Sequence, residues 1–89
     1  MPHQPVKFRL VFTAKVSKEL KQLPLPVQKQ YDKAFQLMSG EGPSYRSLRT
    51  HRYKCKNTET WSSSASMALR FYWEYQGEKT ILVIAIDSH

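Results

Sequence analysis

Apolar and polar residues alternate in several stretches of the chain. In residues 6–13 every second residue is apolar, with Lys7 and Arg9 between them, and residues 68–76 repeat this alternation with mostly aromatic side chains. Residues 80–87 are apolar throughout their middle. A period of two predicts strands with one wet face for the first two stretches, and a continuous apolar run predicts a strand inside a sheet. Residues 47–67 are also strand-like, first through alternating basic residues and then through a serine-rich, extended sequence.

Between the first strand and the basic stretch, apolar residues recur at helical spacing. The spacing predicts a helix over residues 14–23, capped by Thr13, and a second helix over residues 24–39, with Gly40 as its C-cap. Prolines at positions 24 and 26 end the first helix and start the second, because proline is tolerated in a first turn but not inside a helix. The apolar positions are Val16, Leu20 and Leu23 in the first helix and Val27, Tyr31, Phe35 and Met38 in the second.

These segments predict a single α+β domain over residues 1–89, with elements in the order β-α-α-β-β-β. We expect a helical hairpin packed on a mostly antiparallel four-stranded sheet. The one cysteine, Cys55, excludes an intramolecular disulfide, which fits a reducing cytosol. The longest apolar run, residues 81–86, is far shorter than the ~20 residues that cross a bilayer. The expected location is therefore the cytoplasm, without membrane contact.

The net charge narrows the class of partner. Fourteen Lys and Arg against seven Asp and Glu give a formal charge of +7. Such an excess on a small domain is typical of proteins that bind a polyanion: nucleic acid, an acidic protein or an acidic membrane surface. A charge of this size also supports solubility alone. We favour a nucleic-acid or acidic-protein partner.

Four pieces of the sequence, in this order, resemble the RelE/ParE toxin superfamily: VFTAKVSKELKQLP, RSLRTHRYK, ALRFYWEY and ILVIAIDSH. The most diagnostic feature is an arginine inside an aromatic strand, followed by a short turn, an apolar strand and then a small residue and a histidine. The resemblance covers nearly the whole chain. RelE-like members are metal-independent endoribonucleases that cut mRNA in the ribosomal A site, whereas ParE-like members poison DNA gyrase. The resemblance therefore implies one of these two activities for this chain. It also implies an acidic antitoxin, encoded by the adjacent gene, that silences the toxin in a hetero-oligomer.

The resemblance also indicates catalytic residues. Metal-free RNA cleavage needs a base for the 2′-hydroxyl, a cation for the charge that develops on the phosphate, and an acid for the leaving oxygen. Arg70 matches the family arginine that contacts the scissile phosphate, and His89 matches a catalytic basic residue beyond the last strand. His51 lies where some members place a general base. The alternatives are a solvated Arg70 paired with Glu74 and a frayed terminal His89.

RNA-contacting residues are expected on the basic stretch and on the aromatic strand. In a strand over the basic stretch, Arg49, His51 and Tyr53 share one face, and the remaining basic residues share the other. Tyr72 lies on the Arg70 face, whereas Phe71, Trp73 and Tyr75 are predicted to be core. No cofactor and no metal are expected, because the histidines and the cysteine show no metal-ligand spacing. The predicted RNA-binding residues are Arg49, Arg52, Lys54, Lys56 and Tyr72.

Two departures from the family pattern keep other functions open. Serines occupy residues 62, 63, 64 and 66, where the RNA-cutting relatives carry lysines, and the family's segment after the histidine is absent. The leading hypothesis is a toxin that cleaves mRNA on the ribosome and inhibits translation. The alternatives are a ParE-like gyrase poison and a catalytically inactive RelE-like protein that only binds its antitoxin.

Overall fold

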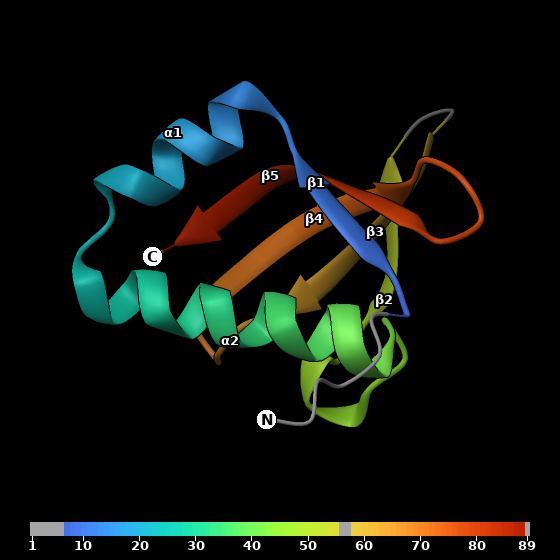
Figure 1. Ribbon diagram of the computed structural model, residues 1–89, viewed down its shortest axis with the longest axis horizontal. Helices are drawn as coiled ribbons and strands as arrows, with labels where there is room; N and C mark the ends of the chain where they lie inside the picture. The colour runs from blue at the N-terminus through green and yellow to red at the C-terminus, as the bar shows by residue number, and fades with distance from the viewer. Residues whose placement is uncertain (1–6, 56–57, 89) are drawn as a thin grey trace.

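Two helices cover one face of a five-stranded mixed sheet in the computed structural model of the chain, which describes residues 7–55 and 58–88 (Figure 1). The elements in chain order are β1 (Arg9–Phe12), α1 (Ala14–Gln22), α2 (Leu25–Glu41), a 3₁₀ helix η1 (Arg46–Leu48), β2 (His51–Cys55), β3 (Thr58–Ser64), β4 (Leu69–Tyr75) and β5 (Thr80–Ser88). The strands lie in the order β1-β5-β4-β3-β2, with β1 parallel to β5 and the other neighbours antiparallel.

The expected α+β class and the helical hairpin are confirmed, but the sheet has five strands rather than four. The basic stretch and the serine-rich stretch each form a strand, β2 and β3, and pair with one another from His51 opposite Ser62 to Cys55 opposite Thr58. β3 then pairs with β4. The strand-like region of residues 47–67 therefore supplies two neighbouring strands, and β2 becomes the edge of the sheet.

The helix ends follow the capping residues, with one correction. The Val16 N–H donates to Thr13 Oγ1 at 3.1 Å, which confirms the predicted N-cap of α1. The prediction that Gly40 caps α2 is wrong, because the helix continues to Glu41. Gly42 is the C-cap, with a φ of 95° that favours glycine, and its N–H donates to the Met38 carbonyl at 3.0 Å. No helix in residues 7–55 and 58–88 is long and apolar enough to span a membrane.

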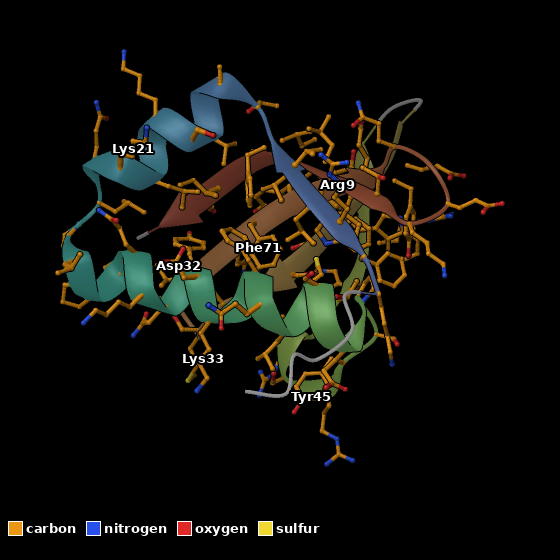
Figure 2. The ribbon with its side chains drawn as sticks, viewed as in Figure 1. Arg9, Lys21, Asp32, Lys33, Tyr45 and Phe71 are labelled. Carbon is orange, nitrogen blue, oxygen red and sulfur yellow. The ribbon has the colours of Figure 1, made fainter. Side chains whose placement is uncertain are left out.

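The core lies between α2 and the central strands. The rings of Tyr31 and Phe35 pack against Phe71 of β4, with centroids 6.5 and 5.0 Å apart. Phe71 lies in this layer in Figure 2, whereas Lys33 extends from α2 into solvent. The helical stripe predicted from the sequence therefore faces the sheet, and the polar side of α2 faces water.

The aromatic face of β4 is only partly buried. Phe71 and Trp73 are fully buried as predicted, and the Trp73 indole N–H donates to Ser63 Oγ at 2.9 Å. Tyr75 was predicted to be core, but 48% of it is exposed. It is the last residue of β4, and its ring contacts those of Phe8 and Trp73 at the rim of the sheet. The alternation continues to this position, but the covering layer does not fully enclose it.

A bulge in β5 adjusts the end of the sheet that carries the site. Tyr72 pairs with Ala85 and Trp73 pairs with Val83, so Ile84 is an extra residue in β5. As a result Ile86 pairs with Phe71 and packs against the core, and Asp87 pairs with Arg70. A regular strand would have turned these last residues of β5 to the opposite faces.

Candidate functional site

The sheet face turned away from the helices carries several of the predicted site residues. Phe71 is fully buried in the core, so its neighbours Arg70 and Tyr72 lie on the opposite face. Ser62 pairs with Tyr72 on one side and with His51 on the other. Because directly paired residues share a face, His51 lies on the same side as Arg70 and Tyr72. We call the side defined by these three residues the open face.

An open hollow of about 500 Å³ lies on this face. It brings together three predicted residues from distant parts of the sequence: Arg49, His51 and Arg70. Arg70 comes from β4, where it pairs with Ser64 on one side and Asp87 on the other. The complete lining is Ser47, Arg49, His51, Ser64, Ser66, Met67 and Arg70.

Arg49 and His51 are positioned by the turn between η1 and β2. Arg49 has a left-handed backbone with φ 48°, and its N–H donates to the Arg46 carbonyl at 3.2 Å. This conformation costs roughly 1–2 kcal/mol for a residue with a Cβ. His51 Nδ1 lies 3.1 Å from the Arg49 carbonyl. A carbonyl oxygen only accepts, so Nδ1 is the donor in this bond, and Nε2 is the ring nitrogen that is left for other partners.

Two tyrosines extend the open face beside the hollow. The rings of Tyr53 and Tyr72 have centroids 4.9 Å apart, and Ser62, which pairs with Tyr72, is 1% exposed. Burial raises the pKa of Tyr72, and the charge of Asp87 and the neighbouring Tyr53 raise it further, while Arg70 acts in the opposite direction. The last and smallest of these effects connects Tyr72 with Arg70 of the hollow.

Other predicted site residues are not brought into the hollow. Arg52 lies on the helix side, with its guanidinium 5.5 Å from the centre of the Trp61 ring and one nitrogen 3.9 Å from Glu59 Oε1. This agrees with the prediction that Arg52 and His51 have opposite faces. His89 and Lys56 lie outside the described residues, as does the side chain of Lys54.

Sequence reasoning missed the remaining lining residues. Ser64 pairs with Arg70, so its place follows from the strand register. Ser66 and Met67 lie in the turn that joins β3 to β4, where Met67 is 93% exposed. Residue alternation identifies which face a strand residue occupies, but it contains no information on how a turn folds over that face.

Tyr31 connects the helical layer to the strand that carries Arg70. Tyr31 has no exposed surface, and its hydroxyl donates to the Arg70 backbone carbonyl at 3.0 Å. The pKa of Tyr31 is raised to about 12, first by burial and then by the charge of Asp87, whereas a hydrogen bond with the Asp87 backbone acts in the opposite direction. The phenol is therefore neutral and able to donate throughout the physiological range.

This buried phenol predicts a loss of stability at alkaline pH. The pKa of Tyr31 is about 12 in the folded protein against 10.0 for an unperturbed tyrosine. Its contribution is fully present below pH 10 and is lost between pH 10 and 12, because only the unfolded chain releases the proton there. The difference corresponds to on the order of 2–3 kcal/mol.

Urea denaturation at several pH values from 9 to 12 measures this effect. Tyr31→Phe should flatten the alkaline decline of the free energy of unfolding, whereas Tyr45→Phe, at an exposed position, should leave the decline as in the parent. Parallel curves for the parent and Tyr31→Phe would contradict the assignment.

Within residues 7–55 and 58–88, no three side chains of His, Cys, Asp or Glu are grouped so that they would hold a metal ion. The lining of the hollow instead offers two guanidinium groups, one imidazole and three hydroxyls. Guanidinium groups bind the paired oxygens of a phosphate or carboxylate, so the hollow is chemically suited to an anionic ligand.

No protein-family model matches the sequence, and no curated protein matches it. Solved structures match over nearly the whole chain. RelE in the RelE–RelB complex from Pyrococcus horikoshii has 12% identity and a TM-score of 0.73, over 92% of this chain and 94% of that one. The YoeB–YefM complex from Staphylococcus aureus has 13% identity and a TM-score of 0.73, over 92% of this chain and 97% of that one. A metal-bound toxin from Helicobacter pylori has 18% identity and a TM-score of 0.68, over 92% of this chain and 94% of that one.

These similarities identify the fold as that of small toxins from toxin–antitoxin pairs. More specifically, the chain has the RelE/ParE toxin fold, which confirms the fold expected from the sequence resemblance.

Proposed function

We propose that this protein is the toxin of a type II toxin–antitoxin pair and acts as a metal-independent endoribonuclease on mRNA bound to the ribosome. The observation that carries the proposal is the hollow on the open face, which gathers Arg49, His51 and Arg70 on a fold shared with RelE and YoeB. The sequence resemblance selects two of these residues, Arg70 and His51, and the basic stretch of the sequence adds Arg49.

The arrangement suits cleavage by the neighbouring 2′-hydroxyl of the RNA. His51 Nε2 accepts the 2′-hydroxyl proton, and the 2′-oxygen attacks the phosphorus. Arg70, with Arg49 beside it, binds the phosphate oxygens and stabilises the added negative charge. The 5′-oxygen leaves with a proton from a general acid, a role we assign to His89. The products are a 2′,3′-cyclic phosphate and a 5′-hydroxyl.

The surroundings of the hollow favour a single-stranded substrate. A single-stranded RNA exposes base faces that stack on aromatic side chains, whereas a duplex hides them. Tyr53, 45% exposed, lies against Tyr72 on the same face as Arg70. The pair provides a surface on which a base next to the cleaved phosphate can stack.

Primer extension on cellular mRNA after induction of the protein tests the proposal. We expect cleavage inside translated reading frames, and no cleavage of the same transcript when its start codon is removed. Growth arrest with intact mRNA and gyrase-linked DNA breaks would instead assign the protein to the ParE-like class. Normal growth with the antitoxin still bound would indicate an inactive relative.

Independence from metal is a separate prediction. We expect a single phosphorothioate at the scissile position to slow cleavage on ribosomes held at constant Mg²⁺, with no recovery on adding Mn²⁺ or Cd²⁺. A thiophilic ion restores cleavage only where a metal ion binds the substituted oxygen, and it cannot replace a guanidinium at that position. The parent phosphate RNA under the same ions is the control. Specific recovery of the phosphorothioate substrate by either ion would contradict the mechanism.

A further inference from the structure

Tyr31 is an unusual side chain for the centre of a small core. Its ring is stacked on Phe35 with centroids 5.9 Å apart and meets Phe71 edge-on at 6.5 Å. Phenylalanine would satisfy both contacts. The hydroxyl instead donates a hydrogen bond to the Arg70 carbonyl, which is 39 residues away in the sequence and lies near the start of β4.

The strand end that carries Arg70 is paired with Ser64 of β3 and Asp87 of β5, both of which lie at or next to the ends of their own strands. Arg70 is the second residue of β4 and follows the turn of residues 65–68. Its partner Asp87 is the last residue but one of β5. Ends of strands fray more readily than their centres, because fewer neighbouring hydrogen bonds hold them. A buried donor on the helix side supplies a fixed point at this place.

We propose that Tyr31 is a positioning residue for Arg70: its hydroxyl holds the Arg70 backbone from the helix side, so that the guanidinium on the open face keeps a fixed place in the hollow. The inference rests on the proposed function. It assigns to a core residue on the opposite side of the sheet a part in aligning the phosphate contact.

The consequence follows from the demands of a bidentate contact. A guanidinium must meet the phosphate oxygens in one plane and at one distance, and a displacement of about 1 Å can cost up to ~10²-fold in rate. In Tyr31→Phe the packing of the ring is kept and only the hydroxyl is lost. We therefore expect the single-turnover rate at saturating mRNA to fall on the order of tenfold, with the affinity for mRNA within about twofold of the parent.

A second mutation separates positioning from a general loss of folded protein. The backbone carbonyl that Tyr31 contacts is present in both the parent and Arg70→Ala, so Tyr31→Phe should lower the melting temperature equally in both. Its effect on cleavage should vanish in Arg70→Ala, because no guanidinium is left to position. Tyr75→Phe, on the same strand at an exposed position, is the control and should leave cleavage unchanged. An equal loss of activity in the two backgrounds, or no loss in either, would overturn the proposal.

Hydrogen exchange provides a test that needs no cleavage activity. The backbone N–H of Phe71 belongs to the same peptide group as the Arg70 carbonyl. It should exchange at least several-fold faster in Tyr31→Phe than in the parent, and at the parent rate in Tyr75→Phe. Unchanged exchange at this amide would overturn the positioning role whatever the protein does to RNA. Faster exchange in a protein that cuts no mRNA would leave the positioning of Arg70 standing and refute the endoribonuclease.

Discussion

Replacing Arg70 by alanine is expected to lower the rate of mRNA cleavage by about 10²–10³-fold, which is the usual loss when one preorganised charge contact to a transition state is removed. The guanidinium lies in the hollow beside Arg49 and His51, and no other residue of β4 lines that hollow. Growth arrest on induction should disappear with the activity.

The fold should survive this change. Arg70 is exposed, and an exposed strand charge contributes about 1 kcal/mol or less to the free energy of unfolding. The backbone carbonyl that accepts from Tyr31 is also unaffected. We therefore expect the melting temperature of Arg70→Ala to lie within a few degrees of the parent.

Single-turnover cleavage on programmed ribosomes and a thermal melt of the same preparation measure the two quantities. Arg9→Ala is a matched control, because Arg9 is also an exposed arginine on a strand, β1 (Figure 2). Arg9 does not line the hollow. Cleavage by Arg70→Ala at the parent rate would refute the catalytic assignment. A large fall in both variants would show that total charge, rather than the site, governs the activity.

The parts of the structure that follow from the sequence are those decided within a few residues. The Thr13 cap depends on a hydrogen bond three residues away, and the burial of Phe71 depends on the alternation of its own strand. Placing Arg70 on the open face required only that alternation. The choice between Gly40 and Gly42 was missed because both glycines are compatible with a helix end, and packing decides which turn is the last.

The features that sequence reasoning missed depend on contacts between distant segments. The extra residue Ile84 is visible only once β5 is aligned with β4. The sequence places Tyr31 in an apolar helical stripe. Only the structure shows that its hydroxyl donates to the Arg70 carbonyl. The hollow itself joins η1, β2, β3, β4 and the turn between β3 and β4, and no local pattern states that these five segments meet.

The acidic product of the adjacent gene, the expected antitoxin, should bind this protein and abolish cleavage. An excess of basic residues faces solvent around the hollow and on the hairpin, where Lys21 and Lys33 extend outward (Figure 2). An acidic segment that folds as it docks gains both charge pairing and apolar contact on such a surface. A ligand present at 1,000 times its Kd and specific for the native state adds about 4 kcal/mol to stability, so the complex should melt well above the free protein.

The structure sharpens the electrostatic part of this prediction. Arg49 and Arg70 line the hollow together, whereas Arg52 lies over Trp61 on the other side of the sheet. If an acidic stretch fills the hollow, Arg49→Ala and Arg70→Ala should slow association and weaken its dependence on salt, because charge steers the encounter. Arg52→Ala changes the net charge by the same amount and is the matched control. Association rates measured from about 50 to 500 mM salt distinguish the outcomes. Equal slowing by all three substitutions would show that the antitoxin responds to the net charge of the whole molecule. The absence of any complex, or of a rise in melting temperature, would refute the toxin–antitoxin proposal.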